Sequence, residues 1–229
     1  ADPRYVTAAG KLEHIAYQEM LELAAQGAKV LQKESVELAM KHRVRLRVLS
    51  SLSEAPGTLV TSENEFKPLQ KHIRGLAHTL NEVKITLLAL PQNSSIIEAI
   101  KVLLESHHIV MDMCHKNLSL CGNYLDYSFT VLGTEEERAI AALQKVKNKL
   151  QFNDLLSDSH VAKISVIGAG IQTEYSPSHK LFQTLREEGI EVQAVAASDI
   201  KLSVLISAKD AGRAVSSLHT IYQLDVEAE

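Results

Sequence analysis

Two passages of the chain repeat the same order of sequence patterns, and this duplication restricts the fold more than any other feature. Residues 84–146 and 163–222 each contain an apolar strand pattern, a loop, an amphipathic helix pattern, two strand patterns and a second helix pattern. Ile85 of the first copy corresponds to Ile164 of the second. This order, closed by a further strand, is typical of ferredoxin-like units. The sequence therefore predicts an α+β fold with two ferredoxin-like (βαββαβ) units.

Local signals in the two copies agree with this prediction. Ser95 and Glu98 fit a capping box at the start of the first helix, and Ser176 is predicted to cap the corresponding helix with Pro177 just inside it. Gly189 is predicted to end this first helix of the second copy. Apolar residues at helical spacing mark the first helix, and they are Ile96, Ile97, Ile100, Leu103 and Leu104.

The strand pattern near residue 164 runs into Gly168-Ala169-Gly170, which resembles the beginning of a dinucleotide-binding loop. The full fingerprint is G-x-G-x-x-G at the start of a helix. Thr173 occupies the third glycine position, and the carboxylate of Glu174 beside it would repel a pyrophosphate. We expect the two glycines to form the first loop of a repeat unit.

Composition excludes several classes of protein. The 229 residues suffice for one large or two modest domains, and the formal net charge is −4 without a basic stripe, which disfavours nucleic acid and anionic membranes as partners. No apolar run could span a bilayer, and the first residues lack a signal-peptide core. Cys114 and Cys121 are expected to be free thiols in a reducing cytoplasm, and their spacing beside His115 fits no standard zinc pattern. His107-His108 is predicted to end a helix.

The repeat resembles the paired ACT domains of the aspartokinase family, in which amino acids bind at interfaces between ACT units. The passages that show this resemblance are "ISVIGAG" and "VAASDIKLSVLI". Positions that match the family motifs are Gly168, Gly170, Ser198, Ile200, Ser203, Val204 and Ile206.

The first sixty residues are similar to the last part of an aspartokinase catalytic domain. Asp2-Pro3-Arg4 and residues 17–25, 27–30, 35–39 and 56–58 stand in the family's order. Because about sixty residues bury too little surface to fold alone, we expect a C-terminal fragment or a regulatory subunit. The alternative is a small independent domain unrelated to any kinase.

The resemblance implies three domains. Residues 1–62 would be the C-terminal end, a helical and strand remnant, of an amino-acid-kinase domain. Residues 63–160 would form the first ACT domain and residues 161–229 the second.

The resemblance also assigns a remnant of a nucleotide site. Arg4 and Lys29 would face the nucleotide, and Asp2 would shape that loop, because cations suit phosphate oxygens. Phosphoryl transfer works mainly by positioning and charge neutralisation, and the upstream part of the family's nucleotide site is missing here. We expect no kinase activity and no cofactor in this chain alone, with ATP and Mg²⁺ needed only by the complete enzyme.

For the effector, the resemblance points to the first helix of each repeat and to the strands that follow it. A helix N-terminus offers free N–H groups and a positive dipole end to a carboxylate. In the first repeat the candidate effector-binding residues are Gln92, Asn93, Ser94, Ser95, Ile96, Ile97, Asp112, Lys116, Asn117 and Asp126. In the second they are Pro177, Ser178, Glu191, Val192, Ser198 and Asp199.

Some of these positions depart from the family pattern. Gln92, Ser94-Ser95 and Lys116 replace an acid, Pro-Gly and Gln, and Tyr175-Ser176 replaces the second Pro-Gly. The identity of the effector, of the lysine or threonine class, therefore stays open. One reading is a feedback-sensing part of an aspartokinase that forms a homodimer through its ACT domains and works with a catalytic chain or domain. The other is a non-catalytic ACT dimerisation module that has lost effector binding, in which these polar residues are ordinary caps and surface groups.

Overall fold

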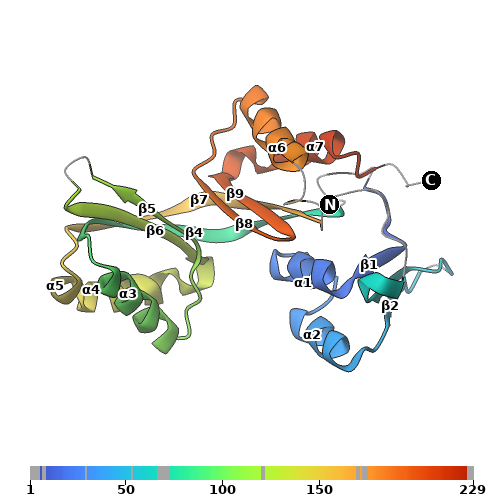
Figure 1. Ribbon diagram of the computed structural model, residues 1–229, viewed down its shortest axis with the longest axis horizontal. Coiled ribbons are helices and arrows are strands. Elements are labelled where there is room, and N and C mark those ends of the chain that lie inside the picture. The colour runs from blue at the N-terminus through green and yellow to red at the C-terminus, as the bar shows by residue number, and fades with distance from the viewer. Residues whose placement is uncertain are drawn as a thin grey trace. The chain divides into compact units, whose positions relative to one another are not determined.

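The computed structural model describes residues 6, 9–28, 30–52, 54–65, 73–119, 122–168, 171 and 175–225, without the side chains of Tyr175 and Ser176. They belong to two compact units (Figure 1). Unit 1 comprises Ala1–Thr79, Lys163–Ile206 and Asp210–Glu229, and unit 2 comprises Leu80–Ala162 and Ser207–Lys209.

Unit 2 is the first ferredoxin-like repeat. Its strands stand in the order β5-β6-β4-β7, and β4 pairs with β6 antiparallel with Ile85 opposite Phe129. Its elements are β4 (Gly75–Pro91), α3 (Ser94–Ser106), β5 (Asp112–Leu118), β6 (Tyr124–Leu132), η2 (Gly133–Glu135), α4 (Glu136–Lys145), α5 (Lys147–Leu150) and β7 (Asp154–Ile167), of which β4 and β7 continue into unit 1.

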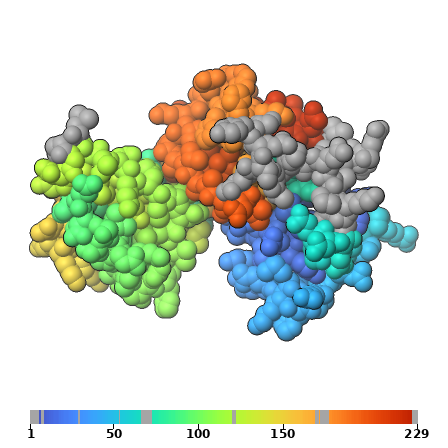
Figure 2. All heavy atoms as spheres, in the orientation of Figure 1, coloured from blue at the N-terminus to red at the C-terminus, as the bar shows by residue number. Residues whose placement is uncertain are grey.

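The core of unit 2 follows from the alternation of its strands. Val83, Ile85 and Leu87 of β4 point to the same face because successive strand residues point to opposite faces. Ile100 and Leu104 of α3 are fully buried against them, as their helical spacing predicts. Figure 2 shows the side chains of this unit as one filled body in green and yellow.

The second ferredoxin-like repeat lies in unit 1, where the strand order is β4-β7-β9-β8. Its further elements are α6 (Tyr175–Glu187), β8 (Ala194–Ser198), β9 (Lys201–Ser207), η3 (Ala208–Asp210) and α7 (Ala211–Ile221). In this unit the strand beside β7 is the first part of β4, and the Arg74 N–H donates to the Ile167 carbonyl oxygen at 2.8 Å. The closing strand of the second repeat therefore precedes the first repeat in sequence.

The N-terminal part of unit 1 is the helical and strand segment that precedes the repeats. It contains β1 (His14–Ala16), α1 (Tyr17–Ala25), α2 (Lys33–His42), β2 (Leu46–Val48), β3 (Thr58–Thr61) and η1 (Glu63–Glu65). A three-stranded sheet has the order β1-β3-β2. A small core of buried side chains, including Ile15, Met20, Val36 and Val60, joins this sheet to both helices.

Both units cross the domain boundaries expected from the sequence. Unit 2 begins at Leu80 and ends its main segment at Ala162. Unit 1 combines the N-terminal segment with the second repeat. The division of the chain into three domains at residues 62 and 160 stays a prediction.

Two helix starts predicted from the sequence are wrong. The N-cap of α3 is Asn93, not Ser95, because the Asn93 side chain accepts a hydrogen bond from the Ser95 N–H. Helix α6 begins at Tyr175, so Ser176 is its second residue rather than its cap.

The predicted helix ends are confirmed. Helix α3 ends at Ser106 with His107 as its C-cap, and His108 has a positive φ of 56°. Gly189 follows α6 with a φ of 67°, which is the left-handed conformation common after a helix.

Candidate ligand-binding site

The residues that the sequence assigns to a nucleotide, Asp2, Arg4 and Lys29, lie outside the described residues. The candidate effector residues are described, and each unit holds its own set.

In unit 2, the start of α3 is an exposed polar turn. The Oδ1 atom of Asn93 accepts from the Ser95 N–H at 3.0 Å and from the Ser95 hydroxyl at 2.9 Å. Gln92, Asn93, Ser94 and Ser95 are all exposed, whereas Ile96 and Ile97 pack against the core. The polar part of the predicted loop is therefore accessible to a ligand, and the two isoleucines anchor it.

The sheet brings Asn117 and Asp126 to the same end of unit 2 as the start of α3. Asn117 of β5 pairs with Asp126 of β6, and Tyr124 of β6 pairs with Pro91, two residues before Asn93. The Asp126 Oδ1 atom accepts from the Ala89 N–H at 2.9 Å. Ala89 has a φ of 53° at a β-bulge, so Asp126 holds the loop before α3 in a backbone conformation that non-glycine residues seldom adopt.

Asp112 stands apart from this group. It begins β5 opposite Thr130, six residues before Leu118, which corresponds to about 20 Å of extended strand. Its Oδ1 atom accepts from the Met113 N–H at 2.8 Å. Lys116 lies between these ends, opposite Tyr127, and is exposed.

Tyr127 carries the clearest electrostatic perturbation in unit 2. Burial raises the pKa of its phenol above the ordinary value, and a hydrogen bond with Cys114 raises it further. The phenol therefore stays neutral at physiological pH and acts in packing and hydrogen bonding.

In unit 1, Pro177 and Ser178 lie in the first turn of α6. The Tyr222 hydroxyl donates to the Pro177 carbonyl oxygen at 2.6 Å, and burial raises the pKa of this phenol above its ordinary value. Ser178 is half-buried. Tyr222, the C-cap residue of α7, thus fixes the first turn of α6 through its hydroxyl.

The remaining candidates of unit 1 lie before, on and after β8. Glu191 is exposed and Val192 half-buried, and both precede the strand. Ser198 ends the strand, and its hydroxyl oxygen is buried without a hydrogen-bond partner among the described residues. Asp199 is exposed in the two-residue turn that leads to Lys201.

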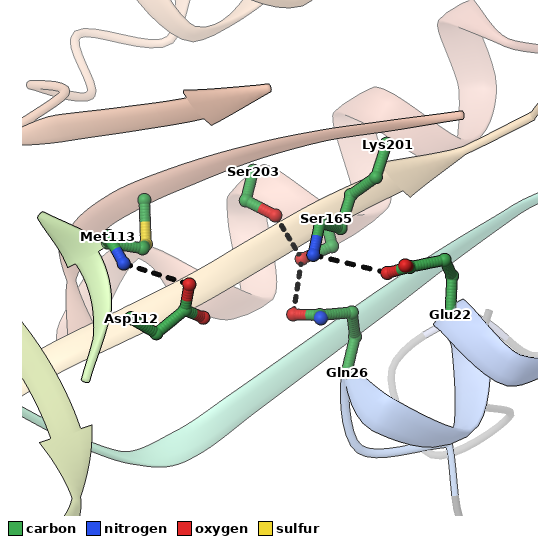
Figure 3. Close-up of polar contacts among 7 residues, drawn as sticks. All are labelled: Glu22, Gln26, Asp112, Met113, Ser165, Lys201 and Ser203. Atoms are coloured by element: carbon green, nitrogen blue, oxygen red, sulfur yellow. Dashed lines mark hydrogen bonds and ion pairs between the residues drawn. The ribbon is translucent and has the colours of Figure 1, made fainter. Parts of the chain in front are cut away.

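A polar cluster in unit 1 was not predicted from the sequence, although Ser203 is one of the positions that match the family motifs. The Ser165 and Ser203 hydroxyl oxygens lie 2.8 Å apart, and Ser165 donates to the Oε1 atom of Gln26 at 3.2 Å (Figure 3). Lys201 Nζ lies 3.1 Å from Glu22 Oε2. One sequence signal could have indicated this cluster. Polar residues stand at every second position of strands that are otherwise apolar, and such positions face the same side of a sheet.

Comparison with known proteins agrees with this geometry. Residues 164–222 match the family described as ACT domain. The fold and this match define a protein with two ferredoxin-like ACT units. No helix within the described part of the chain has the length and apolar character needed to cross a membrane.

The relatives identify the particular family. The chain is 37% identical to an aspartate kinase of Pseudomonas putida over 227 residues, which is 99% of this chain and 55% of that protein. The chain belongs to the aspartokinase family, and it spans about half the length of the curated relatives it matches.

Two solved structures are similar to large parts of the chain. The regulatory subunit of aspartate kinase from Thermus thermophilus is 25% identical, with a TM-score of 0.62, over 66% of this chain and 98% of that subunit. E. coli aspartokinase III in complex with lysine and aspartate is 25% identical, with a TM-score of 0.72, over 96% of this chain and 48% of that enzyme.

Proposed function

We propose that this chain is the feedback-sensing part of an aspartokinase, which binds a small amino acid of the lysine or threonine class. Binding would control the ATP-dependent phosphorylation of aspartate by the complete enzyme. The observation that carries the proposal is the likeness, over 96% of this chain, to an aspartokinase III structure that contains lysine.

The start of α3 supplies the site that we propose in unit 2. Its exposed first turn lies at the positive end of the helix dipole, which attracts a ligand carboxylate. Asn117 and Asp126, at the same end of the sheet, supply oxygen atoms for the ligand ammonium group. Asp126 also holds the bulge at Ala89, so a contact with the ligand there would act on the loop that leads into α3.

Unit 1 offers a second set of contacts. The buried hydroxyl of Ser198 has no partner among the described residues, and burying a polar group unpaired costs about 1–3 kcal/mol. A ligand that hydrogen-bonds to Ser198 would remove that cost. Asp199, exposed in the adjoining turn, supplies a carboxylate for an ammonium group.

We also propose that copies of the chain form a homodimer through their ACT domains. Strand β5 ends the order of its sheet, so one of its sides can pair with another chain. Two exposed apolar residues lie near its ends: Val110, two residues before the strand, is 75% exposed, and Leu118, its last residue, is 62% exposed.

For the complete enzyme, Asp2, Arg4 and Lys29 remain candidates to contact the nucleotide with Mg²⁺, and this chain alone is expected to be inactive. An assay for aspartyl phosphate with the purified chain, ATP, Mg²⁺ and aspartate tests this, and phosphate transfer above background would contradict it.

Calorimetry with lysine, threonine and methionine tests the effector proposal. We expect heat from lysine or threonine, and at least tenfold weaker binding by Gln92→Ala and Asn117→Ala. Lys101→Ala is the matched control, because Lys101 lies on the exposed side of α3 away from its start. Silence with all three amino acids would contradict the proposal. It would support the ACT dimerisation module without effector binding, which the Lys116 substitution in the family pattern favours.

A further inference from the structure

Helix α1 contacts the second repeat through polar side chains on one of its faces. Glu19, Glu22 and Gln26 are spaced by three and four residues, so they share one face of the helix. In Figure 1, α6 and α7 lie on the other side of strands β8 and β9 from α1. Both faces of this sheet are therefore covered within unit 1.

These side chains reach β9 once directly and once through β7. Lys201 faces Glu22, with Nζ and Oε2 3.1 Å apart, and Ser203 reaches Gln26 through the hydroxyl of Ser165. Since Ser165 donates to Gln26, Ser203 donates to Ser165, and each hydroxyl hydrogen in this chain has a defined acceptor. Figure 3 shows the side chains from α1, β7 and β9 converging.

The two contacts of α1 lie on neighbouring strands. Glu22 and Gln26 are separated by a helical rise of about 6 Å, and they reach Lys201 of β9 and Ser165 of β7. Helix α1 can therefore make both contacts at the same time only when it lies over both strands in this register. A one-residue slip would turn the β9 side chains to the opposite face.

Close backbone approach and burial make this arrangement stiff. A β-carbon on Gly27, whose φ is 100°, would lie 3.1 Å from the His78 carbonyl oxygen, and one on Gly75 would lie 3.2 Å from Leu23 Cδ2. Gln26, Ser165 and Ser203 are exposed by 5%, 0% and 1%. A shift of α1 would leave their buried polar atoms unpaired, which costs more than the hydrogen bonds themselves contribute.

Strand β9 links this interface to the turn that carries two of the proposed ligand contacts. Lys201 follows Ile200 directly and pairs with Ser198 across the turn. The Gly168 N–H donates to the Ile200 carbonyl oxygen at 2.9 Å, which ties the turn to the end of β7. A change in the backbone conformation of this turn therefore acts directly on Lys201, which is the next residue of the chain.

We infer that Lys201 and Ser203 are positioning residues that transmit the state of the turn at residues 198–200 to helix α1. Glu22 receives that change from Lys201, and Gln26 receives it from Ser203 through Ser165. The identity of the ligand that acts on the turn rests on the proposed function, whereas the mechanical link does not.

A ligand-free cycle of variants tests the link in the 229-residue chain. Asp199→Gly loosens the turn, because glycine adds backbone freedom, and we expect amide hydrogen exchange in α1 to accelerate about threefold. In the Lys201→Met background the same substitution is expected to accelerate α1 exchange less, because only the route from Ser203 through Ser165 to Gln26 remains. Glu22→Gln provides a second background if Lys201→Met does not fold, and Lys101→Met in α3 is the matched control, which leaves the acceleration intact.

Two results would overturn the inference. One is unchanged α1 exchange in Asp199→Gly while β8 and β9 amides exchange faster. The other is an equal acceleration with and without Lys201. Both results count only in variants whose α3 amides exchange at the same rate as in the parent chain. Since α3 lies in unit 2, an unchanged rate there excludes global unfolding.

A second arm uses lysine and threonine, each at saturation. Two results together support the inference: binding heat with altered α1 exchange in the parent chain, and binding heat with a smaller alteration in Lys201→Met. Heat with unaltered α1 exchange in the parent chain overturns the inference and leaves the proposed function standing. No heat from either amino acid overturns the proposed function, and the ligand-free cycle then decides the inference by itself.

Discussion

The hydroxyl oxygens of Ser165 and Ser203 lie 2.8 Å apart on neighbouring strands of the second repeat, and Thr86 and Ser128 repeat this contact at 2.8 Å in the first. The correspondence of Ile85 with Ile164 places Thr86 at the position of Ser165. In the second repeat, Ser165 also donates to Gln26 of α1. Among the described residues, this contact therefore has a third partner in the second repeat, where α1 covers the sheet, and none in the first.

The Ser165 contact predicts unequal costs for removing equivalent hydroxyls. Ser165→Ala leaves the buried Gln26 Oε1 atom without its donor, so the free energy of unfolding is expected to fall by about 1–3 kcal/mol. Thr86→Val takes the partner of the Ser128 hydroxyl, as Ser165→Ala takes that of Ser203, but it leaves no third group without a donor, so we expect a smaller loss. Urea unfolding of both variants measures the difference, and equal losses would contradict the role of Gln26.

The cap of α3 gives a second prediction. Asn93→Ala removes the acceptor of the Ser95 N–H and is expected to lower the free energy of unfolding of unit 2 by about 1 kcal/mol. Asn93→Asp keeps an acceptor and should retain most of that stability. Ser95→Ala, at the position that the sequence favoured as the cap, should cost less than Asn93→Ala. Hydrogen exchange in α3 reports all three variants, and a larger effect from Ser95→Ala would refute this assignment.

Much of the fold could be predicted because the duplication repeats its signals. Apolar residues at helical spacing predicted α3, and the β-branched run near Val204 predicted β9. The strand that closes the second repeat could not be located from local pattern. It is the first part of β4, more than eighty residues earlier in the chain than β7 ends, and only tertiary pairing shows it.

Local competition explains the misplaced caps. Asn93 and Ser95 are both good N-cap residues, and a capping box with Glu98 favoured Ser95. The structure selects Asn93, which has extended backbone dihedrals, while Ser94 already begins the helix. Sequence alone offered no means to weigh the two residues.

For the candidate site, the sequence predicted which residues take part better than it predicted where they lie relative to one another. The residues of the polar turn before α3 and of the turn at Asp199 came from the resemblance to the aspartokinase family. The separation of Asp112 from Asn117 along β5 required the strand register. The roles of Gln26 and Glu22 depend on α1 meeting a sheet from a distant part of the chain, which no local pattern specifies.

The C-terminal ends of α3 and α6 predict opposite changes in the free energy of unfolding when the residue with positive φ is replaced. His108 N–H donates to Glu105 and Ile109 N–H to Leu104, and Gly189 and Ile190 make the same pair of bonds with Arg186 and Leu185. Both His108 and Gly189 have positive φ, which L side chains adopt at a cost.

His108→Gly is therefore expected to raise the free energy of unfolding of unit 2 by about 0.5–1 kcal/mol, and Gly189→Ala to lower that of unit 1 by about 1 kcal/mol. A β-carbon on Gly189 would meet no atom within 4 Å, so the loss would arise from the backbone alone. Thermal unfolding measures both, and shifts of the same sign would show that φ is not the cause.

The buried imidazole of His219 makes stability depend on pH. His219 is 2% exposed, and its Nε2 atom has no hydrogen-bond partner among the described residues. Burial lowers the pKa of His219 from the ordinary value of 6.5, while Asp225 acts in the opposite direction. The folded state therefore binds this proton less readily than the unfolded state.

The sign of the effect follows from this difference in proton binding. Above pH 6.5 His219 is neutral in both states, so stability there does not depend on it. As the pH falls below 6.5, the unfolded state takes up the proton first, and the free energy of unfolding decreases by up to about 1.4 kcal/mol per pH unit. In His219→Gln this part of the slope between pH 7 and pH 5 should vanish, even if the variant is less stable at every pH. His160→Gln, at an exposed site in β7, is the control that should keep the parent slope, and parallel profiles for the parent and His219→Gln would contradict the assignment.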